Sequence, residues 1–438
     1  MSEKAAKWLR LDNSAKIFPM MADKQNQNLF NIFVRLSEDV DKMILQRALE
    51  ITIKRFPSMN VMLKRGVFWF YFEQHGGKPK VYDADPIVMK KISSSNCGGF
   101  CFRISCYKNV IYADFFHAVT DGTGAAEFVK SLLFTYFTLK GYPVDGEQKV
   151  LTVGSPVNPR EYEDSFLTNY KKKKIKDLTI SSLKGKKSYR ISGIRFENAG
   201  KGVINMYAPA KQFVSVCREH NCTVTEMIGA LFMLSVYETK IKPESLPPQD
   251  IQLFVPINLR KIFSSVTLRN FSLFSRIGVT ATDDMTLQSL TSTIHECLKR
   301  DTQKEVLSDK ISTTVYAEKF LPMRILPLFM KRLIFKISNL FFGKNKKTAT
   351  FSSVGVVSLP ESFRPYIKDM GFGITANNAC PVTITAATAF DTMCINFTRT
   401  ITDTEIEKRF ARYLTDFGID LKVTSNFWEV DDDAMQIL

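Results

Sequence analysis

The feature that most constrains the fold of this chain is an apolar run that ends abruptly at a single histidine. Residues 110–116 have the length and composition of a buried strand, and His117 follows directly. A short turn rich in small and polar residues spans 118–122, and from Thr123 the apolar residues recur at helical spacing. A strand, a turn and a helix in this order deliver an imidazole to the edge of a cavity.

Both halves of the chain mix strand-like and helical segments in a similar order, which indicates an α/β (α+β) fold. With 438 residues and 45% hydrophobic content, the chain is long enough for two domains or one large composite fold. We expect an N-terminal lobe over residues 1–168, a basic crossover linker over 169–193 and a C-terminal lobe over 194–438. The crossover is distinguished by its charge, because residues 169–190 contain nine Lys or Arg and one acid, Asp177.

The net charge of +16 and the pI of about 9.3 are compatible with nucleic acid, an anionic membrane surface or a negatively charged small substrate. No aromatic platform, zinc knuckle or RNP-type motif accompanies the basic segments, so we expect no nucleic acid partner. A second basic region, residues 324–347, combines seven Lys or Arg with Leu, Phe and Ile and has no acid. It is either a helix with a solvated basic face or a surface that touches anionic membrane or a lipophilic acceptor.

The cysteines and the N-terminus indicate a cytoplasmic protein, with peripheral membrane contact as the open alternative. The eight cysteines form no Cys-x-x-Cys pair and no histidine stands at zinc-ligand spacing, so we expect reduced core thiols and no metal site. Residues 1–16 are polar and charged, unlike a secretory signal. The longest apolar run, residues 325–342, is interrupted by Lys331, Arg332 and Lys336, which argues against a spanning helix.

Of the four histidines, only His117 lies at a strand-to-turn junction of the kind that active sites use. A neutral imidazole there can take a proton from a hydroxyl or an amine. Asp121 lies four residues on, but no Gly-x-Ser-x-Gly nucleophile elbow exists in the chain, which argues against a serine triad. A buried carboxylate needs a partner, and Arg260, at the end of an apolar strand in the other half, is the predicted one.

Several segments, taken in order, resemble the CoA-dependent acyltransferase superfamily. This superfamily includes chloramphenicol acetyltransferase, plant BAHD enzymes, alcohol acetyltransferases, wax-ester synthases and the condensation domains of peptide synthetases. His117-Ala-Val-Thr-Asp121-Gly122 matches its His-x-x-x-Asp-Gly signature. Residues 48–57 are similar to its early helix ending in Arg-x-Pro, and residues 223–234 to the helix that opens its second half. Residues 255–260, followed by Asn270, resemble its Val-Pro-x-x-x-Arg and Asn segment.

The resemblance implies two similar lobes, each a mixed, largely antiparallel sheet with helices, around a central tunnel. Acyl-CoA would enter from one side as co-substrate and the acceptor from the other, with no permanently bound cofactor. His117 would be the general base and Asp121 the structural partner of Arg260. Gly122 would permit a tight turn that leaves the tunnel unobstructed. Ser353 falls where the family often has a polar residue beneath the reaction centre, from which it would donate to the tetrahedral oxyanion.

Two departures from the family patterns narrow the resemblance. Phe116 stands where condensation domains usually have a first histidine, and the second BAHD motif, Asp-Phe-Gly-Trp-Gly, is absent. The chain is therefore nearest to the microbial alcohol acetyltransferase-like members. The resemblance predicts transfer of an acetyl or other short to medium acyl group to a hydroxyl or amine of a small acceptor. A condensation-like module with a carrier-protein donor and a degenerate member that only binds its ligand stay open as alternatives.

Overall fold

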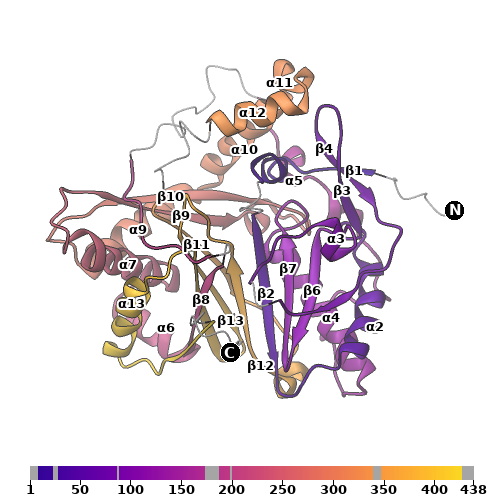
Figure 1. Ribbon diagram of the computed structural model, residues 1–438, viewed down its shortest axis with the longest axis horizontal. Coiled ribbons are helices and arrows are strands. Elements are labelled where there is room, and N and C mark those ends of the chain that lie inside the picture. The colour runs from indigo at the N-terminus through magenta and orange to yellow at the C-terminus, as the bar shows by residue number, and fades with distance from the viewer. Residues whose placement is uncertain are drawn as a thin grey trace.

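The structure is a computed structural model that describes residues 8–22, 28–85, 88–172, 187–197, 200–338 and 347–426. The earlier part of the chain, indigo to purple in Figure 1, and the later part, pink to yellow, form two lobes that lie side by side. Residues 173–186, most of the predicted basic crossover, and residues 339–346 of the second basic region lie outside the described residues.

A five-stranded sheet in the order β12-β2-β7-β6-β5 organises the first lobe. Its strands are β2 (Leu29–Leu36), β5 (Val81–Asp83), β6 (Phe102–Tyr107), β7 (Val110–Phe116) and β12 (Ile367–Ile374). All neighbours are antiparallel except β5 and β6. Helices α2 (Lys42–Thr52) and α4 (Gly122–Leu139) pack together on this lobe, because each has an apolar face. The expected strand before His117 is therefore β7, and the expected helix after it is α4.

A seven-stranded sheet in the order β10-β9-β11-β13-β14-β8-β15 organises the second lobe. Its strands are β8 (Gly202–Pro209), β9 (Asp250–Asn258), β10 (Ser272–Thr280), β11 (Ala349–Val356), β13 (Val382–Ala389), β14 (Thr392–Arg399) and β15 (Lys422–Ser425). Its helices are α6 (Ala210–Glu219), α7 (Val224–Val236) with the π-helical extension η6 (Tyr237–Ile241), α9 (Leu287–Asp301) and α13 (Glu405–Asp416). The strand β11 is parallel to both of its neighbours, and the other pairs are antiparallel.

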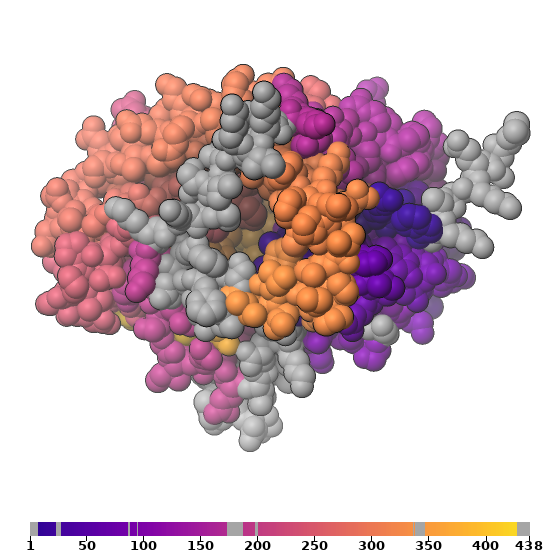
Figure 2. Space-filling model, turned by 90° about the horizontal axis from the view of Figure 1, so that it is seen from above, coloured from indigo at the N-terminus to yellow at the C-terminus, as the bar shows by residue number. Residues whose placement is uncertain are grey.

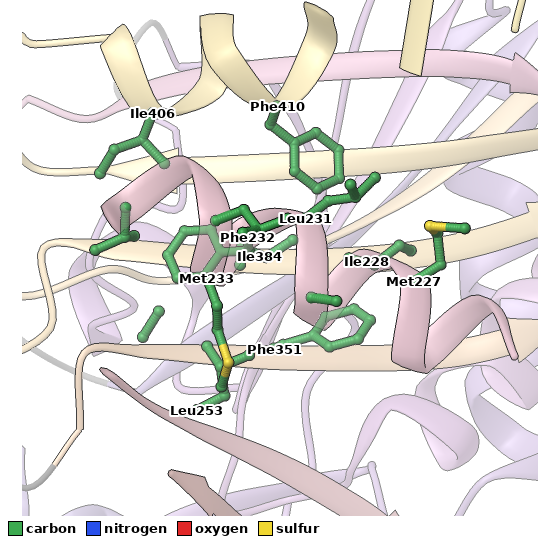
Figure 3. Close-up of a cluster of buried hydrophobic side chains, with 14 of the residues drawn as sticks. Met227, Ile228, Leu231, Phe232, Met233, Leu253, Phe351, Ile384, Ile406 and Phe410 are labelled. Carbon is green, nitrogen blue, oxygen red and sulfur yellow. The ribbon is translucent and has the colours of Figure 1, made fainter. Parts of the chain in front are cut away.

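Helix α7 lies at the centre of the second lobe because its sequence is apolar on all sides. Thr223 and Glu226 form the capping box that starts it. Figure 3 shows its side chains packed among those of the sheet, such as Leu253, Phe351 and Ile384, and those of helix α13, such as Ile406 and Phe410.

A smaller sheet and a group of helices lie at one end of the molecule, at the top of Figure 1. The sheet has the order β1-β4-β3, with β1 (Trp8–Arg10), β3 (Val61–Arg65) and β4 (Phe70–Gln74). The helices are α1 (Ile17–Met21), α10 (Lys304–Lys319), α11 (Leu321–Ile325) and α12 (Leu328–Ser338). The remaining short elements are α3 (Ser94–Cys97), α5 (Ser165–Thr168), α8 (Arg260–Phe263), η1 (Ile53–Arg55), η2 (Pro159–Tyr162) and η8 (Glu361–Tyr366).

Strand β12 links the two lobes. It comes from the second half of the chain, yet it pairs with β2 of the five-stranded sheet and packs beside β13 of the seven-stranded sheet. The Thr383 hydroxyl donates to the Ile374 carbonyl over 2.8 Å, and the Thr385 hydroxyl donates to the Phe372 carbonyl. The prediction of two α/β lobes with mixed, largely antiparallel sheets is confirmed.

None of the helices within the described ranges is both long and apolar enough to cross a bilayer.

The core in Figure 3 leads to a stability prediction. Phe410 is fully buried and packs edge to face on Phe397, with ring centroids 5.2 Å apart. Phe410→Ala should lower the free energy of unfolding by about 3–5 kcal/mol, because it leaves a cavity between α13 and the sheet. Val423→Ala, at a side chain that is 50% exposed, is the matched control and should change it by less than about 0.5 kcal/mol. Urea titrations measure both, and equal midpoints would contradict the prediction.

Candidate active site

His117 lies where the first lobe faces the second, immediately after β7. Its backbone N–H donates to the Asn28 carbonyl over 3.1 Å, which fixes the chain at the start of β2. The imidazole stacks on the Phe18 ring of α1 at a centroid distance of 4.4 Å and meets the edge of Phe30 at 5.0 Å. The side chain is only partly exposed. Two aromatic rings therefore hold the imidazole in one orientation.

Asn270, from the loop between α8 and β10, determines which imidazole nitrogen carries the proton. The His117 Nδ1 and Asn270 Oδ1 atoms are 2.9 Å apart. The Asn270 amide nitrogen faces two acceptors, Asp12 Oδ2 at 3.4 Å and the Ala118 carbonyl at 3.5 Å, so its oxygen must be the atom that faces His117. Nδ1–H therefore donates to Asn270, and Nε2 keeps the lone pair that a base needs.

Asp12, which accepts from the Asn270 amide nitrogen, is fully buried. One of its carboxylate oxygens accepts from the Ala15 backbone N–H over 2.7 Å, which holds the segment before α1 in place. The other faces Arg269 Nε at 3.6 Å. The Arg269 guanidinium also donates to the carbonyls of Arg10 and Tyr162. The buried charges of Asp12 and Arg269 therefore both have partners, and buried charges are tolerated only under this condition.

The environment of His117 favours its neutral form. Burial lowers the pKa of His117, and the negative charge of Asp121 and the hydrogen bond to Asn270 oppose this only in part. Burial acts in this direction because an imidazolium loses more hydration energy than an imidazole. His117 therefore holds an unprotonated Nε2 at neutral pH, as a general base requires.

Asp121 forms a two-pronged ion pair with Arg260 across the interface between the lobes. Arg260 Nη1 donates to Oδ2 over 2.9 Å, and Nη2 donates to Oδ1 over 2.8 Å. Both side chains are buried. Backbone N–H groups of Phe271 and Gly124 also donate to the carboxylate, at 3.0 and 3.2 Å. Burial alone would raise the pKa of Asp121, but Arg260 and these hydrogen bonds outweigh it, so the pKa lies below its ordinary value.

The same loop of the second lobe satisfies the rest of the Arg260 guanidinium. Nε donates to the Thr267 carbonyl over 2.8 Å, and Nη2 donates to the Arg269 carbonyl over 2.6 Å. The Thr120 hydroxyl, in the turn after His117, donates a hydrogen bond to the Leu268 carbonyl over 2.6 Å. Residues 267–271 thus bond either to Arg260 or to residues 117–121, so one loop carries both the support of the ion pair and the Asn270 contact.

Helix α4 starts earlier than the sequence suggested. Asp121 is its N-cap residue, and Gly122, rather than Thr123, is its first residue. Gly122 does not have the left-handed backbone of a tight glycine turn; a Cβ there would lie 2.9 Å from Val354 Cγ1 of β11. At Gly124 a Cβ would lie 2.0 Å from the Leu268 carbonyl oxygen. Both glycines are needed for close approach of the second lobe rather than for a turn.

Ser353 lies on β11, one residue before Val354, and its side chain is exposed. Its Oγ accepts from the Gly355 backbone N–H over 3.1 Å, and within the described ranges the hydroxyl donates to no other group. The register of β11 on β13 shifts between these two residues, and Gly355 has a φ of +70°. This bulge brings Val354, the residue after Ser353, against the start of α4. Within the described ranges, no hydrogen bond joins Ser353 to His117.

The site contains residues for which the sequence predicted no role, among them Asp12, Phe18, Gly124 and Asn270. Asn270 was recognised only as part of a segment, and its contact with His117 spans 153 positions in the chain. Asp12 and Phe18 come from a short N-terminal stretch without a clear periodic pattern. Only Asn270 carried a usable signal, because it is the one amide in a loop that follows the predicted partner of Asp121.

Among the residues that the structure describes, no three His, Cys, Asp or Glu side chains are grouped as metal ligands. The eight cysteines are unpaired, and six of them are buried.

No model of a known protein family matches the chain, and no curated protein matches its sequence. Solved structures do match. Polyketide synthase associated protein 5 from Mycobacterium tuberculosis superposes with a TM-score of 0.60 at 13% identity, over 94% of this chain and 98% of that one. TRI101 of F. graminearum, complexed with coenzyme A and deoxynivalenol, superposes with a TM-score of 0.63 at 9% identity, over 95% and 100% of the two chains.

The match extends to condensation domains. The starter condensation domain of rhizomide synthetase RzmA, in complex with C8-CoA, superposes with a TM-score of 0.59 at 11% identity, over 94% of this chain and 95% of that one. The chain therefore shares its fold with these proteins, which is the fold that the resemblance implied.

The ion pair yields a prediction for stability. Asp121→Asn removes the charge but keeps the shape, and it should cost about 3–5 kcal/mol because the Arg260 charge stays buried without its partner. Glu73→Gln is the control, since its ion pair with Lys64 is about half exposed and is worth about 0–1 kcal/mol. Denaturant unfolding measures both, and equal losses would contradict the prediction.

The same variant has a predicted pH dependence. The pKa of Asp121 is lowered in the folded state, so the pair contributes its full stability above the unfolded value of about 3.9. That contribution is lost as the pH falls through the lowered folded pKa. The difference between wild type and Asp121→Asn should therefore be constant from pH 8 to about pH 5 and shrink only in strong acid. A difference that vanished near pH 6 would contradict it.

Proposed function

We propose that the protein is an acyl-CoA-dependent acyltransferase in which His117 is the general base. The observation that carries this proposal is the His117–Asn270 hydrogen bond, because it commits Nδ1 to donation and leaves Nε2 basic. The fold supports acyl transfer in general, since the trichothecene acetyltransferase TRI3 and an RzmA condensation domain share it.

The proposed reaction is direct transfer without a covalent enzyme intermediate. His117 Nε2 takes the proton from the hydroxyl or amine of the acceptor, whose oxygen or nitrogen attacks the thioester carbonyl carbon. The tetrahedral intermediate collapses, the carbon–sulfur bond breaks, and the imidazolium returns the proton to the CoA thiolate. The products are the ester or amide and free CoA. The substrate brings the nucleophile, so no enzyme serine or cysteine is required.

The neighbouring residues have supporting roles in this proposal. Asp121 holds the turn through Arg260 and takes no proton, because its low pKa and its hydrogen bonds keep it ionised. Gly122 lets Val354 of β11 pack closely against the start of α4. Ser353 would donate its hydroxyl proton to the oxyanion of the tetrahedral intermediate.

The donor is proposed to be acyl-CoA carrying an acetyl or other short to medium acyl group, and the acceptor a small, lipophilic alcohol or amine. Solved structures of the same fold contain CoA together with a small acceptor, or C8-CoA. The chain has a net charge of +16, which suits the phosphates of CoA. A carrier protein as donor is the second candidate, since two of the structural neighbours come from peptide synthetases.

His117→Ala should reduce transfer by about 10²–10⁴-fold, the usual contribution of a general base, while the thermal transition is retained. Release of the CoA thiol from acetyl-CoA and octanoyl-CoA, with a panel of alcohols and amines, is the measurement. His220→Ala, at an exposed histidine outside the site, is the control and should keep wild-type turnover. Near wild-type activity of His117→Ala would refute the assignment. Activity only with a loaded carrier protein would favour the second candidate.

The lowered pKa of His117 predicts the acid limb of the pH–rate profile. Activity should fall as the pH drops through a value below about 6.5, because only the neutral imidazole accepts the proton. Asn270→Ala removes a hydrogen bond that raises this pKa, so its acid limb should move to lower pH and its kcat should fall more than its KM rises. An acid limb above pH 6.5 in the wild type would contradict the assigned environment of His117.

A further inference from the structure

Helices α11 and α12 expose an unusual number of large apolar side chains. On α11 these are Leu321 and Ile325, which are 64% and 63% exposed. On α12 five more are between 40% and 62% exposed: Phe329, Met330, Leu333, Ile334 and Ile337. Their positions follow helical spacing, so they form one continuous stripe along α12. A large contiguous apolar patch on a protein surface marks an interaction site.

The polarity of α12 is inverted relative to an ordinary surface helix. Its apolar stripe faces outward, whereas Lys331 is fully buried on the inner face. The Lys331 ammonium donates to the Phe68 carbonyl over 2.8 Å and lies 3.8 Å from the centroid of the Trp69 ring. A buried lysine needs such partners, and these hold the helix with its apolar side exposed. The exposure of the stripe is therefore enforced by the contacts of the inner face.

The turn between β3 and β4 extends the same surface. The Leu328 backbone N–H donates to the Val67 carbonyl over 2.8 Å, which joins the start of α12 to this turn. Val67 and Phe68 are 72% and 46% exposed. We call the exposed apolar residues of α11, α12 and this turn the apical patch, since they lie at the top of Figure 1.

Positive charge surrounds the apical patch. Residues 320–338 contain no acid. Arg324 and Lys319 are exposed. Lys171 and Lys172 are exposed beside α10, where the Lys171 backbone N–H donates to the Ser312 hydroxyl over 3.4 Å. An outward apolar stripe bordered by basic side chains is the pattern of helices that lie in the interface of an anionic membrane.

We propose that the apical patch docks on the surface of an anionic lipid membrane. The apolar stripe would enter the boundary between headgroups and acyl chains, and Lys319, Arg324 and neighbouring basic residues would contact lipid phosphates. A second copy of the chain would have to face the same excess of positive charge, which disfavours self-association through this patch.

The docked face borders the candidate active site. Helix α12 packs against α1, and Phe18 of α1 stacks on His117. Figure 2 views this face and shows a hollow at the seam of the lobes, bordered on one side by the orange residues of α11 and α12. Docking would therefore bring the side of the site that carries Phe18 close to the membrane. The proposal concerns binding alone and stands or falls independently of acyl transfer.

Vesicle flotation of the full chain tests the proposal, with vesicles of pure phosphatidylcholine or of phosphatidylcholine with phosphatidylglycerol. The wild type should float with the anionic vesicles at low salt and less at high salt. Burial of one apolar side chain favours binding by roughly tenfold, so Phe329→Gln combined with Leu333→Gln should weaken binding about 100-fold. Arg324→Gln should weaken only anionic binding, by several-fold.

Met43→Gln combined with Ile194→Gln is the matched control, since these side chains are 79% and 80% exposed outside the apical patch. It should float like the wild type. The wild type failing to float with anionic vesicles, or the control losing binding as much as the patch variant, would overturn the proposal. Equal binding to both vesicle types would overturn the claim that the basic residues select anionic lipid. Dimerisation lost in the patch variant by size-exclusion chromatography, without vesicle binding, would assign the patch to a second copy instead.

Discussion

The buried ion pair between Asp121 and Arg260 is the interaction on which the rest of this structure depends. Two charges removed from water are stable only if both are fully bonded, and here the Asp121 carboxylate accepts two guanidinium and two backbone N–H groups. One partner comes from each lobe. The pair therefore fixes the distance and orientation between the turn after His117 and the loop at 267–271. Every other contact of the candidate site uses that alignment.

The imidazole of His117 is held by a second, weaker layer of contacts. Asn270 sets the tautomer, and Asp12 and the Ala118 carbonyl set the orientation of Asn270. Phe18 stacks on the ring, and Phe30 packs edge to face against it. Burial favours the neutral base, and Asp121 adds a negative potential without touching the ring. Asp12 thus acts on His117 indirectly, through its contact with the Asn270 amide, whereas Asp121 acts through its electrostatic potential at the imidazole.

Helices α1, α11 and α12, at one end of the molecule, connect the candidate site to the exposed apical patch. The inner face of α12 is fixed by Lys331 and the turn between β3 and β4, so its apolar stripe has no place within the fold. Helix α1 lies between α12 and His117. A lipophilic acceptor drawn from a membrane would have a short path to the proposed base, and the membrane surface and the catalytic chemistry would then be two parts of one arrangement.

Local chemistry in the sequence was enough to predict the strand, His117 and the turn, because an apolar run followed by a histidine, an aspartate and a glycine has few other interpretations. It also predicted the pairing of Asp121 with Arg260, since a buried carboxylate needs a cation and Arg260 ends an apolar strand. The tertiary structure alone decided the rest. Asp12, Phe18 and Asn270 reach His117 only through long-range packing, and Gly122 proved necessary for the approach of Val354 rather than for a turn. The sequence left residues 324–347 as either a helix with a solvated basic face or a surface that touches a membrane, and only the packing partners of α12 decided that its apolar side faces outward.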